Sequence, residues 1–383
     1  MAKFLKKSLG YLAVAVLSAA LTMAFFVPRQ QQGDKLDEIL YLAQQYYVED
    51  VDLEALRDGA AQGIVDALGD RWSYYVSAKD AQSHQEYVNN AYVGVGITVV
   101  TKADDPTITV QAVTKGGSAQ EAGILPGDVL VRVEDTDCEG LSVDQVRDMV
   151  RGEEGTTVRL TVLRDGQMLE FSLQRRTIQT PVAEYEMLPG DIGLIAIANF
   201  DARCAQETLA AIEELRAMGA KSLIFDVRNN GGGFKDEMVK ILDYLLPEGK
   251  LFVGQRYDGK QSIDYSDENY LDMPMVVLVN GRSYSAAELF AAALEEYDAA
   301  VVVGQQTSGK GYYQVSYQLS DGSLLALSIG KYCTPNGVSL EGVGITPEVM
   351  VEVDEETDAA IYYGQLEPME DPQILAAIEV LTK

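Results

Sequence analysis

The sequence predicts a multidomain α/β protein, in which a helical N-terminal region and a small, partly open β-barrel precede a larger domain with a mainly parallel sheet. Three observations predict it. Apolar residues recur at helical spacing over residues 34–91, short alternating strands with glycine turns fill 92–176, and apolar strands alternate with helices over 177–355. With 383 residues, the chain is also too long for one ordinary domain.

The first residues differ in composition from the rest. A charge-free run from Leu9 to Val27 follows three lysines and is long enough to cross about 30 Å of hydrocarbon. The run ends in Phe-Phe-Val-Pro-Arg, where a secretory signal would have a small-x-small cleavage site, so an uncleaved anchor is favoured over a cleaved signal. We therefore expect residues 1–33 to be a signal anchor and linker. The protein would then be a single-pass protein of the cell membrane, with the bulk of the chain extracytoplasmic.

Composition excludes several functions. The 30 basic residues against 59 acidic ones give a net charge of −29, so nucleic acid is not an expected partner. The only histidine, His84, lies in the helical stretch KDAQSHQEYV and is interpreted as a solvated helix residue, which leaves no histidine for a serine-histidine triad or a multi-histidine metal site. The three cysteines lack CxxC spacing. No metal or other cofactor is expected.

The second region, 92–176, contains YVGVGITVV and later GSAQEAGILPGDVL, and this order of strands, turns and helix resembles a PDZ domain. The resemblance implies a groove between a strand and a helix, where a C-terminal peptide adds as an extra strand. Taken alone, YVGVGI could equally be a strand with two packing glycines; the second motif favours the PDZ interpretation. The peptide carboxylate would meet the backbone amides of Val93, Gly94, Val95 and Gly96.

In the third region, the strands DIGLIAIANF, SLIFDV, MVVLVN and AVVVG alternate with helices. This alternation predicts a largely parallel sheet covered on both faces, with its chemistry at the carboxyl ends of the strands. Residues 356–383 are expected to form a helical C-terminal tail.

Two turns after these strands could carry chemistry. DVRNNGGG ends in three glycines, whose unhindered amides could bind an oxyanion or simply form a structural turn. In NGRSYSAAE, Ser285 and Glu288 have the spacing of a capping box, and alone this favours a structural role. A serine at a helix N-terminus could also be a nucleophile that gains from the helix dipole and from the next amide, that of Ala286.

A third turn, GQQTSGKG, nearly matches a phosphate-binding loop. Gly311 stands where that loop needs Ser or Thr, and an alternating strand follows instead of a helix, so this interpretation is rejected. Lys310 could be a solvated loop lysine. Alternatively, desolvation beside Tyr312 and Tyr313 could lower its pKa, so that it serves as general base toward a serine.

These segments, in this order, resemble the carboxyl-terminal processing peptidases, a family of Ser-Lys proteases. The resemblance runs from about Leu36 to the end and includes GDRWSYYVS and YCTPNGVSLEGVGITPE. It implies a crotonase/Clp protease-like fold for residues 177–355. It also implies that Ser285 is the nucleophile, Lys310 the base and Gln314 the residue that orients Lys310. The oxyanion donors would be the amides of Ala286 and of Gly231 or Gly232.

The sequence departs from the family pattern at two positions. Tyr284 stands before the nucleophile, where the family usually has a small residue, and Ala287 replaces a second serine of the helix. Tyr284 could narrow the cleft, so the family's substrate preference is not carried over.

The predicted function is a membrane-anchored, extracytoplasmic serine endopeptidase that cuts proteins near their C-termini, with the PDZ domain recognising the tail or regulating the enzyme. Expected partners are proteins or peptides with accessible C-terminal tails, the membrane through the anchor, and other copies of the chain in a homo-oligomer. One alternative is a catalytically silent PDZ-containing scaffold, and another is a non-proteolytic enzyme on a related sheet. Ser285, Lys310 and Gln314 in register argue against the scaffold, because it needs none of them.

Overall fold

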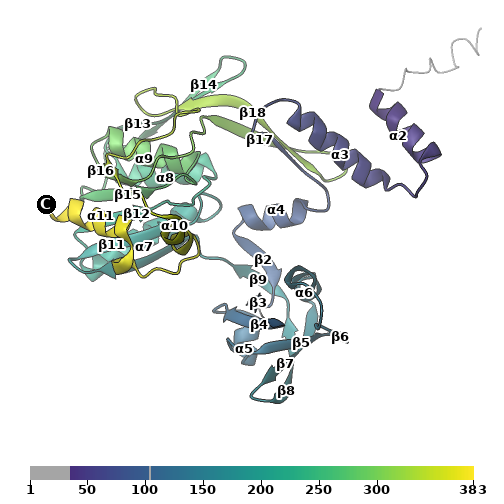
Figure 1. The fold of residues 1–383 in the computed structure, drawn as a ribbon. Helices are drawn as coiled ribbons and strands as arrows, with labels where there is room; N and C mark the ends of the chain where they lie inside the picture. Colours follow the sequence, from purple (N-terminus) through teal and green to yellow (C-terminus); the bar gives the residue numbers. More distant parts are fainter. Residues whose placement is uncertain (1–34, 103–104) are drawn as a thin grey trace, which may run out of the picture.

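The structure, a computed structural model, describes residues 35–102 and 105–383 (Figure 1). The anchor predicted in residues 1–33 lies outside these residues. Within the described ranges, no helix combines the length and the apolar character that a membrane crossing requires.

The N-terminal region is helical, with one strand that the sequence analysis missed. Its elements are α2 (Lys35–Tyr46), α3 (Leu53–Asp66), β1 (Tyr74–Val76) and α4 (Ala81–Val88). Helix α3 begins after Asp52, whose carboxylate accepts the N–H groups of the first turn at 3.0 and 3.1 Å. Strand β1 pairs antiparallel with β18 (Leu324–Cys333), because its aromatic and β-branched residues add to the edge of a sheet.

The small β domain is an antiparallel sheet with two short helices. The strand order is β3-β4-β5-β7-β8, with β6 beside β5. A capping box between Ser142 and Gln145 starts helix α6 (Val143–Val150), whose apolar side closes the domain core. A separate ribbon of β2 and β9 connects the domain to the α/β domain. The bounds are β2 (Ala91–Gly94), β3 (Ile97–Lys102), β4 (Asp105–Val113), α5 (Ser118–Ala122), β5 (Val129–Val133), β6 (Thr136–Asp137), β7 (Thr157–Arg164), β8 (Gln167–Gln174) and β9 (Arg176–Gln179).

The α/β domain contains a sheet of order β10-β11-β12-β15-β16-β19, in which all neighbours are parallel except β10 and β11. Its apolar strands alternate with helices, as the sequence predicts for a sheet buried on both faces. The elements are β10 (Ala183–Leu188), β11 (Ile192–Ile197), α7 (Cys204–Met218), β12 (Ser222–Asp226), α8 (Lys235–Leu245), β15 (Met275–Val279), α9 (Ala286–Glu296), β16 (Ala300–Gly304) and β19 (Val349–Met350).

The prediction of a mainly parallel sheet describes only part of this domain, because a second sheet is entirely antiparallel. Its order is β1-β18-β13-β14, with β17 also paired to β18, and its strands are β13 (Gly249–Arg256), β14 (Gln261–Ser266), β17 (Tyr312–Gln318) and β18. These strands form hairpins, and β14 and β17 mix polar and apolar residues instead of forming the continuous apolar runs on which the prediction rests.

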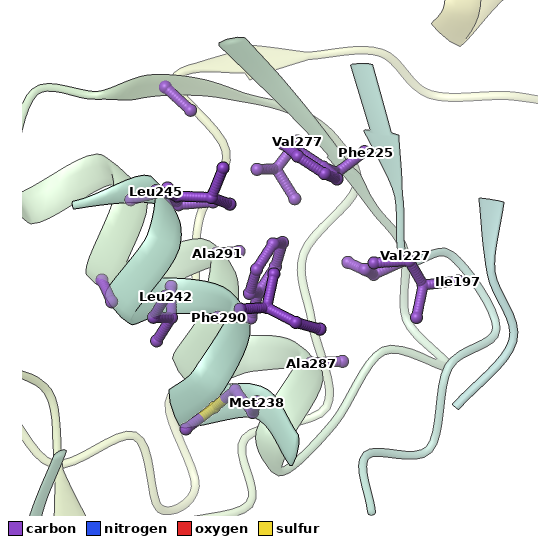
Figure 2. Packing of buried hydrophobic residues seen from close by; sticks show 14 of the residues in the cluster. Ile197, Phe225, Val227, Met238, Leu242, Leu245, Val277, Ala287, Phe290 and Ala291 are labelled. Atoms are coloured by element: carbon purple, nitrogen blue, oxygen red, sulfur yellow. The ribbon is translucent and has the colours of Figure 1, made fainter. Parts of the chain in front are cut away.

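Helices cover both faces of the parallel sheet. In β12, Phe225 points into the core beneath α7, α8 and α9, while its neighbour Ile224 points to the opposite face. Figure 2 shows Leu242 of α8 and Phe290 of α9 in this core. That face is covered by α11 (Pro372–Thr382), through Ile374 and Ala377. The C-terminal segment, which also contains α10 (Glu355–Tyr362) and the 3-10 turn Pro368–Glu370, therefore contributes to the core of the domain.

Candidate active site

Ser285 lies in a strained turn between β15 and α9. Its backbone has φ 61° and ψ −122°, a combination that non-glycine residues rarely adopt. Neighbouring hydrogen bonds hold this turn. The N–H of Tyr284 donates to the Asn230 carbonyl at 3.1 Å, and the Ser283 hydroxyl donates to the Val227 carbonyl at 2.7 Å. The turn after β15 is thus fixed to the glycine turn after β12.

The glycine turn packs directly against Ser285. A methyl group on Gly232 would lie 2.7 Å from the Ser285 Cβ and 2.9 Å from the Ala286 nitrogen, so this position requires glycine. The Gly232 N–H donates to Asn230 Oδ1 at 2.8 Å. Within the described residues, no hydrogen bond occupies the N–H of Gly231 or of Ala286. Of the two glycine amides predicted as oxyanion donors, that of Gly231 is therefore the available one.

The side chain of Glu288 connects the turn that contains Ser285 with the loop that contains Lys310. This fully buried carboxylate accepts the N–H of Ser285 at 3.0 Å and the N–H of Lys310 at 2.9 Å, both at Oε2. Its other oxygen accepts the Thr307 hydroxyl at 2.5 Å and the Gly309 N–H at 2.7 Å. Burial raises the pKa of Glu288, while these hydrogen bonds act in the opposite direction. Glu288 therefore fixes the loop that contains Lys310 as well as the start of α9.

Lys310 is enclosed by aromatic side chains. Its Nζ lies 5.0 Å from the centroid of the Trp72 ring and 5.9 Å from that of Tyr284, and these two rings stack on each other. Burial lowers the pKa of Lys310 to about 8, against the opposing charges of nearby carboxylates, those of Asp70, Glu288 and Glu341. No hydrogen bond between described residues joins the Lys310 ammonium to the Ser285 hydroxyl; the ammonium lies against the rings instead.

Gln314 does not contact Lys310 in this arrangement. Its side-chain amide donates to the Ser328 hydroxyl at 2.8 Å and to the Tyr312 carbonyl at 3.2 Å. A contact between Gln314 and the Lys310 ammonium, as the family resemblance implies, would have to use the side-chain oxygen Oε1, because an ammonium group only donates.

Two aromatic residues beside Ser285 and Lys310 were not among the predicted site residues. Trp72, the only tryptophan in the chain, comes from the N-terminal region and donates to the Glu341 carboxylate at 3.3 Å. Buried Tyr332 donates its hydroxyl to the Lys310 carbonyl and also interacts with the Ser285 side chain; burial raises the pKa of Tyr332. The segment GDRWSYYVS pointed to Trp72 only through the family resemblance, and no local signal identified Tyr332.

His84, interpreted as a solvated helix residue, lies on α4 as expected but is half-buried. Its ring packs edge-on against Tyr74, with 5.8 Å between the ring centroids. No interaction between described residues joins it to Ser285 or Lys310.

The PDZ groove is present between β3 and α6, with a volume of about 260 Å³. Gly94, Val95 and Gly96 line it, whereas Val93 pairs with Thr177 of β9 and is not among the lining residues. At one wall, the Arg151 guanidinium forms a 2.9 Å salt bridge with Glu86 of α4.

Comparisons with known proteins agree with this organisation. Residues 191–351 match the model of peptidase family S41, residues 109–164 match a PDZ domain, and residues 19–80 match the N-terminal domain of the activating protease CtpB. The carboxy-terminal processing protease CtpA of Bacillus subtilis is 32% identical over 84% of this chain and 69% of its own length. A probable CtpA-like serine protease of Staphylococcus epidermidis is 34% identical over 84% of this chain. The chain spans 66% of that relative's length.

Among solved structures, a putative S41 protease from Bacteroides fragilis superposes with a TM-score of 0.54 at 16% identity. The match covers 91% of this chain and 96% of that protein. At this level of identity, the likeness concerns the fold alone.

Proposed function

The chain belongs to peptidase family S41, the carboxy-terminal processing proteases, and on this basis we propose that it is an endopeptidase that uses Ser285 as nucleophile and Lys310 as general base. One observation carries the proposal: the Glu288 carboxylate accepts the backbone N–H groups of both residues. The burial of Lys310, which lowers its pKa to about 8, supports its role as base. A desolvated lysine is neutral in a useful fraction of molecules near pH 8 and can then accept a proton.

The reaction would proceed through an acyl-enzyme. Neutral Lys310, having left the ring faces, takes the Ser285 hydroxyl proton while Oγ attacks the peptide carbonyl. The amides of Ala286 and Gly231 stabilise the resulting oxyanion. The C–N bond then breaks, and the lysine ammonium returns its proton to the leaving amine. Water, deprotonated by the same lysine, hydrolyses the ester and regenerates Ser285.

We extend the proposal to the PDZ groove, which would bind a C-terminal tail by strand addition. The Arg151–Glu86 salt bridge supports a regulatory role, because a ligand carboxylate in the groove would compete with Glu86 for the guanidinium. Glu86 lies on α4, and just beyond it the Val88 carbonyl accepts the N–H of Ala202 in the α/β domain at 3.1 Å. Tail binding could therefore alter the contact between α4 and the catalytic domain.

The dyad is tested with a fluorophosphonate probe and a tailed peptide substrate. We expect the full-length wild type to be labelled and to cleave the peptide, and Ser285→Ala to do neither. A silent scaffold would bind the tail but would show neither labelling nor cleavage. Labelling that persists in Ser285→Ala would show that another residue is the nucleophile.

Residues 1–33 are proposed to anchor the protein in the membrane, with the rest outside the cytoplasm. Alkaline carbonate should leave the full-length protein in the membrane fraction, and protease added to intact cells should degrade the α/β domain. Release of intact protein that retains Met1 would contradict the anchor. Association into a homo-oligomer stays a prediction.

A further inference from the structure

The N-terminal region reaches the active site through one short segment, residues 70–73. The shape of this segment is set locally, because the Asp70 carboxylate accepts the N–H of Trp72 at 3.0 Å and the hydroxyl of Ser73 at 2.6 Å, as in an Asx turn. The Ser73 oxygen in turn accepts the N–H of Ser328 at 3.0 Å, and β1, which follows directly, pairs with β18. The segment is therefore fixed to the antiparallel sheet of the α/β domain.

Hydrogen bonds occupy every main-chain N–H and carbonyl group of residues 308–311, the loop that contains Lys310. Most of the partners belong to the α/β domain, and they are Ser283, Glu288, Tyr332, Glu341 and Gly342. The carbonyl of Ser308 differs, because its partner among the described residues is Arg71 of the N-terminal region, at 3.2 Å. The same guanidinium nitrogen donates to the Gly309 carbonyl, also at 3.2 Å. The N-terminal region thus completes the hydrogen bonding of this loop.

A second contact reaches the other side of Lys310. The Trp72 indole N–H donates to Glu341 Oε1 at 3.3 Å, while Oε2 of the same carboxylate accepts the N–H of Gly311 at 2.7 Å. Gly311 packs closely here, since a methyl group on it would lie 2.7 Å from the Glu341 nitrogen. Arg71 and Trp72 also contact each other, with 4.1 Å between the guanidinium carbon and the ring centroid. The two side chains therefore hold the loop just before and just after the lysine.

We propose that Arg71 and Trp72 are positioning residues of the protease, which fix Lys310 through the main chain of its loop. This inference rests on the proposed function. A shift of the loop would change where the lysine amine reaches toward Ser285, and a displacement of about 1 Å is enough to slow catalysis strongly. Two residues from outside the α/β domain would thus set the rate of a reaction whose nucleophile and base both lie inside it. Full activity then requires the N-terminal region to be docked on β18.

The first test compares Arg71→Met with the wild type, both full-length, on a peptide substrate. Methionine keeps an apolar side chain beside Trp72 but cannot donate to the Ser308 and Gly309 carbonyls. We expect kcat to fall about tenfold and KM to stay within about threefold, because the change affects the base and not the binding of substrate. Arg71→Lys retains a donor and should recover part of the loss. The control Arg57→Met removes another exposed arginine of the N-terminal region, on α3, and should keep both constants.

The fluorophosphonate probe gives a readout that needs no peptide. Its reaction with Ser285 depends on Lys310 but not on peptide binding, so the labelling rate of Arg71→Met should fall by the same factor as kcat. Trp72→Phe keeps a ring, loses the N–H that donates to Glu341 and should slow labelling about threefold. Rates are compared on the high-pH plateau of each variant, so that a changed pKa of Lys310 does not contribute.

The outcomes separate this inference from the proposed function. If the wild type neither cleaves peptide nor reacts with the probe, the proposed function fails. If the wild type is active but Arg71→Met keeps both rates within about twofold, or if cleavage slows and labelling does not, Arg71 does not position the base. Urea unfolding distinguishes a loss of rate from a loss of folded protein. Should Arg71→Met not fold, Arg71→Lys and Trp72→Phe decide by the same two rates.

Discussion

The carboxylate of Glu288 accepts the backbone N–H of Lys310 at 2.9 Å, although 22 residues separate the two positions. The same oxygen accepts the N–H of Ser285. One buried side chain therefore sets the position of the proposed nucleophile and the proposed base together, through their main chains. Neither functional side chain is used in these hydrogen bonds, which fix the main chain alone.

Glu288→Gln should impair both catalysis and folding. A glutamine has one acceptor oxygen for four donors, and an unsatisfied buried N–H costs about 1–3 kcal/mol of unfolding free energy. Small displacement of the dyad should lower kcat about 10²-fold. Because the Glu288 charge raises the pKa of Lys310, the pH midpoint of any residual activity should move downward. Urea unfolding and a pH profile check this; Glu295→Gln, on the same helix, should leave the profile unchanged.

Activity should depend on pH through Lys310. Below a pKa of about 8 the lysine is protonated and cannot act as base, so kcat/KM should fall about tenfold per pH unit and should level off above pH 8. Lys310→Ala should abolish turnover, and adding Ser285→Ala should make it scarcely worse, because members of one catalytic unit are not additive. The nearby Lys331→Ala should retain activity. A flat profile between pH 6 and pH 8 would argue against a lysine base.

The aromatic enclosure should be required for the lowered pKa of Lys310. Trp72→Ala opens the site to water, so the pKa should rise toward its ordinary value and the pH midpoint should move upward, with a loss of activity at pH 7.5. Trp72→Phe retains an aromatic face and should shift the midpoint less. An unchanged midpoint in Trp72→Ala would mean that other groups desolvate the lysine.

Blocking the PDZ groove should remove the effect of the substrate's tail. Val143 lines the groove and is half-buried, so Val143→Glu places a charge in the groove with little change to the domain core. Cleavage rates of a substrate with a free C-terminus and of the same substrate with an amidated one should become equal. Gln167→Glu adds the same charge at the exposed β7–β8 turn and should preserve the wild-type difference. An undiminished difference in Val143→Glu would reject a role for this groove.

The glycine turn should depend on a buried ion pair for its stability. Arg228 contacts Asp226 at 2.5 Å and Asp371, at the start of α11, at 2.7 Å. Arg228→Met leaves the buried carboxylate of Asp371 and the partly buried one of Asp226 unpaired, and should lower the unfolding free energy by about 3–5 kcal/mol. Arg216→Met, which removes an exposed pair, should cost about 1 kcal/mol or less. Equal losses of unfolding free energy in the two variants, measured by urea unfolding, would contradict the role of Arg228 in stabilising the glycine turn.

Local patterns determined much of the site in advance. The spacing of Ser285 and Glu288 marked the start of α9, the three glycines marked a turn with open amides, and the apolar strands marked the parallel sheet. Each of these signals depends on residues within a few positions of one another, because helix caps, turns and strand periodicity are short-range properties. The roles of Ser285 and Lys310 came instead from the order of the motifs in a known family.

Only the tertiary structure decided which segments distant in the sequence contact one another around the site. Trp72 contacts Glu341 across 269 positions and stands over Lys310, α11 covers the second face of the sheet, and the antiparallel sheet joins β1 to β18. The Asn230 side chain occupies the Gly232 amide and leaves that of Gly231 available, which the letters GGG cannot reveal. These facts are long-range because they arise from packing and from competition for hydrogen-bond partners between segments that chain folding brings together.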